Sequence, residues 1–114
     1  MIATTPAPPY YAVIFTSLQS DDTHDYAATA DHMVLLASQQ PGFLGIESAH
    51  GDIGITVSYW SSLEAIRAWK RNADHLTAQQ QGRAKWYSAY HTRIALIERD
   101  YHFEARQDEN PVVK

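Results

Sequence analysis

Cysteine is absent from the 114 residues of this sequence. That absence excludes a disulfide scaffold, a zinc–thiolate site, an iron–sulfur cluster and a thiol nucleophile. Apolar runs are also short, and none approaches the ~20 residues that a membrane-spanning helix requires. The opening MIATTPAPPYY has neither a basic nor an apolar stretch, so we expect no secretory signal, no membrane partner and a cytoplasmic location.

Lysine and arginine are missing from residues 1–66, which hold seven acidic residues. The net charge of −4 argues against a nucleic-acid partner. All nine basic residues follow residue 66, and the segment from Arg67 to Arg93 contains six of them beside one acid, Asp74. One cationic segment in an acidic protein indicates a small anionic ligand or a charge-matched partner. The alternative is a solvated helix face.

The length fits one domain, because ~100–200 residues per domain leave no room for a second core. Pro6, Pro8 and Pro9 lack the amide donors that a β-ladder needs, so residues 1–9 are expected to form an extended arm. The folded domain is predicted over residues 10–103, and the polar residues 104–114 are predicted to form a tail.

Apolar and β-branched runs alternate with two helical patterns. Strands are predicted over Tyr10–Ser17, Phe43–His50, Gly54–Trp60 and Trp86–Tyr101, the last with an irregular start. A helix is predicted over residues 25–39, with an apolar stripe of Tyr26, Ala30, Met33 and Ala37. A second helix begins after Ser61 or Ser62, with a stripe of Leu63, Ile66, Trp69 and Ala73. Asp74 could cap a further short helix over residues 75–81.

The order β-α-β-β-α-β is the signature of the ferredoxin-like split βαβ fold, which belongs to the α+β class. Its antiparallel sheet carries both helices on one face. The strands do not become polar at alternate positions, so the opposite face also needs a cover. We therefore expect two sheets to pack together in a homodimer, which makes a second copy of the chain the predicted partner.

Three stretches of the chain resemble the antibiotic biosynthesis monooxygenase (ABM) family: QPGFLGIES (40–48), GITVSYWSSLEAIRAWK (54–70) and HLTAQQQGRAKWYSAY (75–90). The resemblance extends from Tyr10 to Tyr101. It implies a dimeric α+β barrel of ferredoxin-like subunits, with a pocket between the helices and the sheet of each subunit. It also implies a small monooxygenase that oxidises an aromatic or quinonoid substrate with O2 and needs no metal, flavin or heme.

The resemblance also extends to relatives that bind heme and degrade it. They carry an asparagine on the first strand, a tryptophan on the second helix and a histidine ten residues after that tryptophan. Trp69 matches the tryptophan, whereas Gln79 stands at the histidine position and the first strand has no asparagine. Heme binding is therefore a third reading, in which His75 would be the axial ligand.

His75 and Arg83 are the candidate catalytic residues. In the first turn of a helix capped by Asp74, the positive end of the helix dipole would disfavour the imidazolium form of His75. A neutral imidazole can accept a phenolic proton. Arg83 lies between Gly82 and Trp86, where its guanidinium could hold a carboxylate or a phenolate. The alternatives are a surface histidine near a turn and a surface or dimer contact of the arginine.

The candidates for substrate binding are Trp69, Trp60, Asn72, Trp86 and Tyr59. Indole rings beside a cavity make flat walls for an aromatic ligand, although an aromatic residue at helical spacing is more often part of the core. Tyr59 and Trp60 are neighbours on one strand, so one should face the helices and the other the opposite side. Arg67, Lys70 and Arg71 lie off the apolar stripe, so we expect them to face water.

No His-x-x-x-His pair, glycine-rich nucleotide loop or Ser-His-Asp motif occurs, so neither a metal site nor a nucleotide cofactor is predicted. The first reading is a cofactor-independent monooxygenase that acts on a small aromatic ligand. A non-catalytic dimer that binds a small hydrophobic anion in the same pocket is the alternative.

Overall fold

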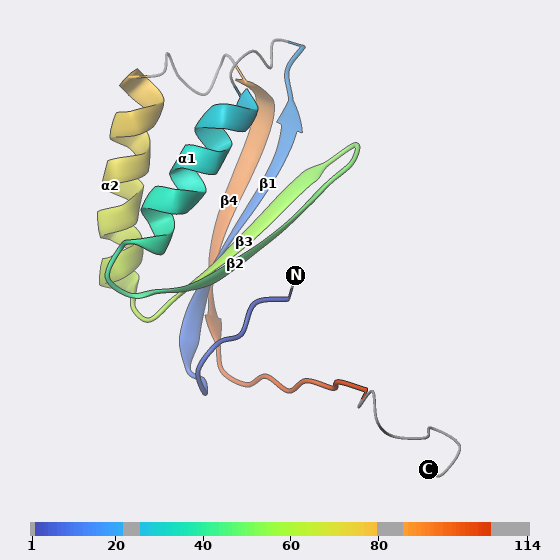
Figure 1. Ribbon diagram of the computed structural model, residues 1–114, viewed down its shortest axis with the longest axis vertical. Coiled ribbons are helices and arrows are strands. Elements are labelled where there is room, and N and C mark those ends of the chain that lie inside the picture. Colours follow the sequence, from blue (N-terminus) through green and yellow to red (C-terminus); the bar gives the residue numbers. More distant parts are fainter. Residues whose placement is uncertain (1, 22–25, 80–85, 106–114) are drawn as a thin grey trace.

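The computed structural model describes residues 2–21, 26–79 and 86–105, and only the backbone of residues 76–79. Its elements are β1 (Tyr10–Gln19), α1 (Tyr26–Ser38), β2 (Phe43–His50), β3 (Gly54–Trp60), α2 (Leu63–Gln79) and β4 (Tyr87–Ile97) (Figure 1). This order is the predicted one, and the ferredoxin-like α+β fold is confirmed. Among the described residues, no helix is long and apolar enough to cross a membrane.

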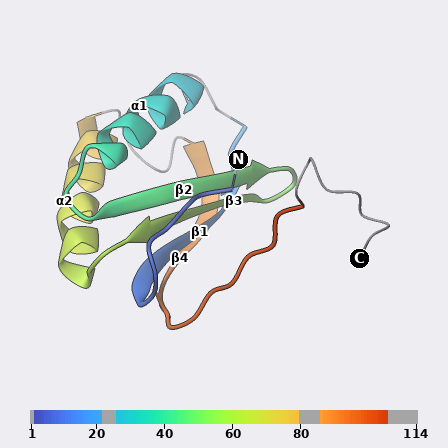
Figure 2. The same ribbon diagram turned by 60° about the horizontal axis from the view of Figure 1, so that its bottom comes forward.

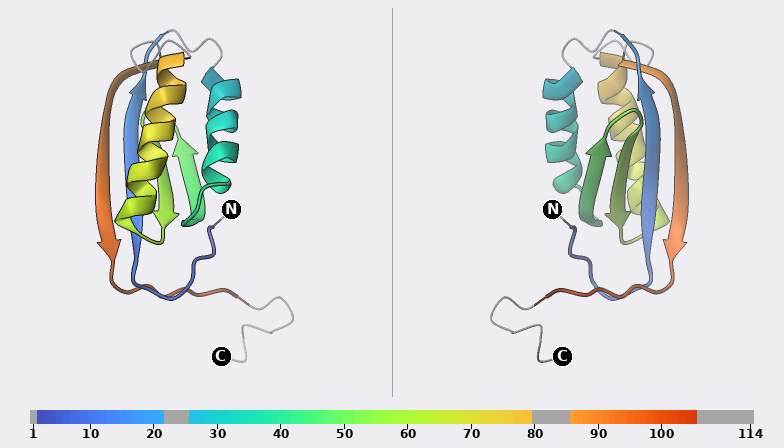
Figure 3. Two further views of the ribbon diagram at one scale, coloured as in Figure 1. Left: turned by 90° about the vertical axis from the view of Figure 1, so that its left-hand side faces the viewer. Right: turned by 90° about the vertical axis from the view of Figure 1, so that its right-hand side faces the viewer.

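The four strands form one antiparallel sheet in the order β2-β3-β1-β4. Both helices lie against one face, here named the inner face (Figure 3). The opposite, outer face carries no helix in the part of the chain that the structure describes. β1 lies between two neighbours in the sheet, which agrees with its being apolar on both faces.

The strand boundaries predicted from the sequence agree with β2 and β3 and are too long for β4. β4 begins at Tyr87 and ends at Ile97 rather than at Tyr101. Ile97 pairs with Tyr10, the first residue of β1, so the next residues have no strand to pair with. The predicted irregular start of this strand is a register shift next to Leu18 and Gln19 of β1.

α2 is one continuous helix, so the separate helix predicted over residues 75–81 is wrong. The side-chain oxygen of Ser62 accepts a hydrogen bond from the amide of Ala65 at 3.0 Å and caps the start of α2. Asp74 lies inside the helix, where its Oδ2 forms an ion pair with the Nζ of Lys70 at 2.9 Å. Residues four apart lie on the same side of a helix, so this pair favours continuation past Asp74.

Trp60 is the centre of the packing between the sheet and the helices. Its side chain is fully buried in a cluster with Ala37 of α1 and Ile66 of α2. The indole nitrogen of Trp60 donates a hydrogen bond to the hydroxyl of Ser58 at 2.9 Å, so its polar atom is satisfied inside the core. Trp60 therefore anchors the two helices to one end of the inner face.

The N-terminal arm, residues 2–9, covers one end of the outer face. It runs from the start of β1 across to β2 (Figure 2). The amide of Ala3 donates to Oε2 of Glu47 at 2.8 Å, and the hydroxyl of Tyr59 donates to Oε1 of the same carboxylate at 2.8 Å. A β-carbon at Gly45 would lie 3.0 Å from the side chain of Ala3, so a glycine there lets the arm approach closely. At this end of the sheet, Tyr10 is only 4% exposed.

Candidate functional site

A cavity of about 460 Å³ lies between the two helices and the inner face of the sheet. The apolar stripe predicted for the first helix lines it, and its members are Tyr26, Ala30, Met33 and Ala37. Three members of the stripe predicted for the second helix also line it: Ile66, Trp69 and Ala73. The apolar stripes of both helices thus form walls of the cavity and part of the core.

Short hydroxyl side chains form part of the floor of the cavity. Thr56 of β3 and Thr92 of β4 lie on either side of Phe15, because Phe15 pairs with both of them across the sheet. Ser58 follows two residues along β3, and Ser17 follows two residues along β1. These four hydroxyls, here named the hydroxyl strip, leave space above the sheet and supply donors and acceptors to a ligand.

Trp69 forms the aromatic wall at one end of the cavity. Its ring stacks on that of Trp60, with centroids 6.2 Å apart and planes 21° apart. Trp60 is fully buried and is not among the described residues that line the cavity. Trp60 therefore supports Trp69 from behind and fixes the orientation of the exposed indole plane.

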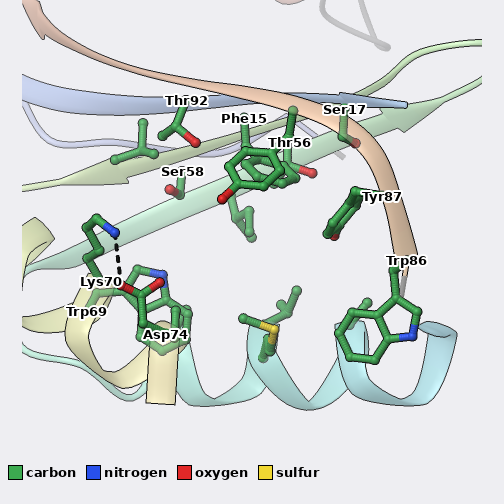
Figure 4. Close-up of a pocket in the computed structure, with 18 of the residues that line it drawn as sticks. Phe15, Ser17, Thr56, Ser58, Trp69, Lys70, Asp74, Trp86, Tyr87 and Thr92 are labelled. Carbon is green, nitrogen blue, oxygen red and sulfur yellow. Dashed lines mark hydrogen bonds and ion pairs between the residues drawn. The ribbon is translucent and has the colours of Figure 1, made fainter. Parts of the chain in front are cut away.

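A cluster of aromatic rings closes the other end of the cavity (Figure 4). Trp86 is 3% exposed and makes an edge-to-face contact with Tyr26, with centroids 5.9 Å apart. Tyr87 makes edge-to-face contacts with Tyr26 at 5.8 Å and with Phe15 at 5.3 Å. The cavity is thus bounded by flat apolar surfaces at both ends and by hydroxyl groups between them.

A hydrogen bond joins the hydroxyls of two tyrosines in this cluster. The hydroxyl of Tyr87 donates to that of Tyr26 at 3.4 Å. Burial raises the pKa of Tyr87 far above its usual range, and the hydrogen bond to Tyr26 raises it further. Tyr87 therefore stays protonated near neutral pH and acts as a donor rather than as a base.

Charged groups gather at the rim of the cavity. Lys70 and Asp74 both line it, and their side chains are 66% and 43% exposed (Figure 4). Lys70 thus faces water, as expected, but it also borders the cavity, which the sequence did not predict. His50, at the end of β2, lines the cavity and also an adjoining hollow of about 200 Å³ beside α1. Among the described residues, no group of three or more His, Cys, Asp or Glu is placed to hold a metal ion.

The structure brings only part of the predicted set of site residues together. Trp69 and Trp86 line the cavity, and Trp60 supports it from the core. Tyr59 faces the other way, on the outer face, where it is hydrogen-bonded to Glu47. The sequence predicted that Tyr59 and Trp60 point to opposite faces, and the structure decides which of them is turned toward the helices.

Two further predicted residues, His75 and Asn72, are not among the described residues that line the cavity. His75 is exposed on α2, and the argument that placed it in the first turn of a helix does not apply to a continuous α2. The side-chain amide of Asn72, which is also exposed, donates to Oε1 of Gln40 at 3.1 Å. Arg83 lies outside the described residues. The catalytic and binding roles assigned to these residues stay predictions.

Sequence analysis missed the hydroxyl strip and the charged rim. The signal for the strip was present in β3, where Thr56 and Ser58 alternate with apolar residues, so the expectation that the strands do not become polar at alternate positions is wrong for this strand. The signal for the rim was the spacing of four residues between Lys70 and Asp74. Neither pattern reveals on its own that the side chains face a cavity.

Comparison with known proteins places the chain in a family. The profile described as antibiotic biosynthesis monooxygenase matches residues 9–81. The uncharacterized protein YqjZ of Bacillus subtilis (strain 168) is 47% identical over 105 residues, which cover 90% of this chain and 92% of YqjZ. The resemblance noted in the sequence is therefore confirmed.

Solved structures share the fold at low sequence identity. NE2512, a protein of unknown function from Nitrosomonas europaea, has a TM-score of 0.67 at 11% identity and covers 88% of this chain and 100% of its own. SnoaB, a cofactor-independent oxygenase from Streptomyces nogalater, has a TM-score of 0.59 at 11% identity and covers 90% and 100%. From the family profile and the relative YqjZ together, the chain belongs to the antibiotic biosynthesis monooxygenase family.

Proposed function

We propose that the protein is a small monooxygenase that oxidises an electron-rich aromatic or quinonoid substrate with O2 and uses no resident cofactor. The observation that carries this proposal is the cavity of about 460 Å³, with aromatic walls at both ends and the hydroxyl strip between them. Pockets of this size bind small organic molecules. The fold shared with SnoaB, a cofactor-independent oxygenase, and membership of the family support the reaction class.

The substrate itself must supply the electrons in such a reaction. A methylene carbon activated by phenolic rings loses a proton, and the resulting anion transfers electrons to O2 and forms a carbon–oxygen bond. One oxygen atom stays on the carbon as a carbonyl, and the other leaves as water with both hydrogens of the methylene group. The methylene group supplies all the electrons that reduce O2 to these two products, so no external reductant is needed.

The described residues suit the parts of this reaction that a protein must perform. Trp69 and Trp86 would hold the ring system by stacking, and the hydroxyl strip would donate to the phenolate oxygen as charge develops there. His75 and Arg83 remain the proposed base and oxyanion partner. His50 is a second candidate for the base, because it lines the cavity.

Oxygen uptake with a panel of anthrones and dihydroxyarenes tests the proposal. We expect one O2 consumed per product, with one labelled oxygen atom in the product and the other in water when labelled O2 is used. Trp69→Phe should lower turnover, while Arg67→Gln, an exposed position of α2 outside the described lining, should not. Tight binding of the panel without any enzyme-dependent oxygen uptake would contradict the proposal and favour the alternative.

The alternative is a non-catalytic dimer that binds a small hydrophobic anion. The observation that favours it is the position of the Lys70 ammonium group at the rim of an otherwise apolar cavity. Lys70→Gln should then weaken binding of an anionic aromatic ligand more than Arg67→Gln does, and binding of a neutral analogue should be unaffected. A loss shared equally by both variants would indicate diffuse surface charge.

The heme reading has less support from the described residues. His75, proposed as its axial ligand, is exposed and is not among the described residues of the lining. A Soret band in the purified protein that His75→Ala abolishes would revive this reading.

We also propose that the protein is a homodimer in which two outer faces pack together. Beyond the arm, this face exposes Leu18 at 45% and Ile55 at 42%, and Ile14 and Val57 are half-buried between them. A sheet face of this composition is favourably buried against a second copy of itself. Sedimentation at micromolar concentration tests this, and a monomer of 12.9 kDa would contradict it.

A further inference from the structure

His50 lies at the junction of the cavity and the hollow beside α1. It lines both spaces, as do Tyr26 and Thr56. The hollow, of about 200 Å³, is also bordered by Asp31 and Ser48, and both of these residues are exposed. A polar space of this size that opens to solvent can hold water. The imidazole of His50 therefore borders both the ligand cavity and a space that water can enter.

Gly54 allows this imidazole to lie over the floor of the cavity. Gly54 pairs with His50 of β2 and with Ser17 of β1, so the three residues form one row across the sheet. A β-carbon at Gly54 would lie 3.2 Å from Nδ1 of His50 and 3.1 Å from Oγ of Ser17. The imidazole and the hydroxyl thus approach the same point above the glycine. Because Ser17 belongs to the hydroxyl strip, a base and a hydrogen-bond donor are neighbours on the sheet side of the cavity (Figure 4).

We propose that His50 is the base that takes the proton from the methylene group of the substrate, and that the hollow is the route by which this proton reaches solvent. This inference rests on the oxidation proposed above. It assigns the base to His50 in place of His75, which is exposed and is not among the described residues that line the cavity. Imidazole titrates near neutral pH, so it can both accept and release a proton during one reaction.

The proton balance of the reaction fits one imidazole. When His50 takes the proton, the electron pair stays on the substrate carbon, which then bonds to O2 and becomes a peroxide anion. The imidazolium returns a proton to the outer peroxide oxygen. The second methylene hydrogen then leaves as a proton, the oxygen–oxygen bond breaks, and the departing hydroxide combines with that proton as water and leaves the carbonyl. Without O2, only the first step remains, and the proton exchanges with solvent.

Proton exchange without O2 isolates this step from the rest of the reaction. The protein is mixed anaerobically with dithranol, a dihydroxyanthrone, in heavy water, and NMR follows the deuterium that enters the methylene group. His50→Gln should slow the enzyme-dependent exchange by at least about a hundredfold and leave dithranol binding within about twofold, because it removes the base and not the aromatic walls. The matched control, His32→Gln, changes an exposed histidine of α1 outside the described lining and should exchange at the wild-type rate.

Small changes beside His50 test its position and the route. Gly54→Ala should slow exchange several-fold, because Ser17 is buried and the exposed imidazole must move away from the added methyl group. Gly51→Ala should not, because no described heavy atom beyond its own chain neighbours lies within 4 Å of the added β-carbon. Ser48 lines the hollow and is not among the described residues of the larger cavity. Ser48→Phe, which fills the hollow, should slow exchange, whereas Ser48→Ala should not.

The outcomes separate this inference from the proposed function. A wild type that catalyses neither exchange nor oxygen uptake with dithranol overturns both. Oxygen uptake by the wild type together with exchange that His50→Gln retains overturns this inference alone. Loss of exchange in His75→Gln, with His50→Gln unaffected, does the same and returns the base to His75. Equal exchange rates in Ser48→Phe and Ser48→Ala overturn the proposed route.

Discussion

The two faces of the sheet are built from alternate residues of the same strands, yet they are covered in different ways. Along the inner face, short residues such as Thr56, Ser58 and Thr92 leave a space of about 460 Å³ beneath the helices. Along the outer face, the arm covers one end, where the carboxylate of Glu47 accepts hydrogen bonds from Ala3 and Tyr59. Apolar side chains stay exposed at the other end.

This contrast separates two uses of a sheet surface. Where small hydroxyl side chains lie under the helices, they leave a cavity, and Phe15 of the same face also lines it. Where apolar side chains are exposed, as at the open end of the outer face, their burial is favourable. The difference is not visible in overall composition, because both faces draw on the same strands.

The largest expected loss of stability comes from the core between the inner face and the two helices. Trp60→Ala should lower the free energy of unfolding by about 3–5 kcal/mol, because it removes a fully buried indole and leaves Ser58 without its partner. Urea denaturation measures this. A loss under about 1 kcal/mol would mean that Trp60 is not the anchor of the packing between sheet and helices.

The second largest loss of stability is expected on the outer face, at the two hydrogen bonds that Glu47 accepts from the arm and from Tyr59. Glu47→Ala removes the acceptor of two hydrogen bonds, one from the amide of Ala3 and one from the hydroxyl of Tyr59. We expect a loss of about 1.5–3 kcal/mol, together with faster proteolysis of the arm. Glu64→Ala, an exposed position of α2, is the control. Equal losses in both variants would show that the arm contributes nothing through Glu47.

Truncating Trp69, which forms a wall of the cavity, should lower the free energy of unfolding less than truncating Trp60, which supports that wall. Trp69→Ala should lower the free energy of unfolding by about 1–2 kcal/mol, because the indole already borders open space. Its effect on binding of an aromatic ligand should be larger than its effect on stability. Thermal melts with and without a bound ligand compare the two quantities, and an unchanged ligand-induced shift would mean that the ligand does not use this wall.

The smallest expected effect is a loss of stability at alkaline pH, which tests single tyrosine hydroxyls on the two faces. Burial, followed by the hydrogen bond to Glu47, raises the pKa of Tyr59 to about 12 from an ordinary value of 10.0. The unfolded chain then loses this proton first, so the stability that Tyr59 contributes is complete below pH 10 and falls as pH rises toward 12.

Urea midpoints at about pH 8 and about pH 11 measure this loss. The decrease should be shallower in Tyr59→Phe than in the wild type, because phenylalanine carries no proton to lose. Tyr87→Phe is the matching change on the inner face, where burial raises the pKa of the hydroxyl even further. Parallel curves for the wild type and Tyr59→Phe would refute the role of Tyr59.

Much of the fold, but less of the site, could be predicted from the sequence. Strands β2 and β3 and the apolar stripe of α1 were predictable because they depend on neighbours within a few residues. The end of α2 was not, since Asp74 fits both a cap and an interior ion pair, and only the helix itself decides between them. Because α2 continues past Asp74, His75 does not lie in the first turn of a helix, where the sequence had placed it.

The sequence by itself determined the order of strands and helices, the family and the presence of aromatic residues suited to a ligand. Only the tertiary structure decided that Thr56 and Thr92 flank Phe15, that Lys70 borders the cavity and that Ala3 bonds to Glu47. The physical reason is the separation along the chain between the residues that interact. Helix and strand periodicity act over a few neighbouring residues, whereas these contacts join residues from separate elements, and their partners are set by sheet register and packing.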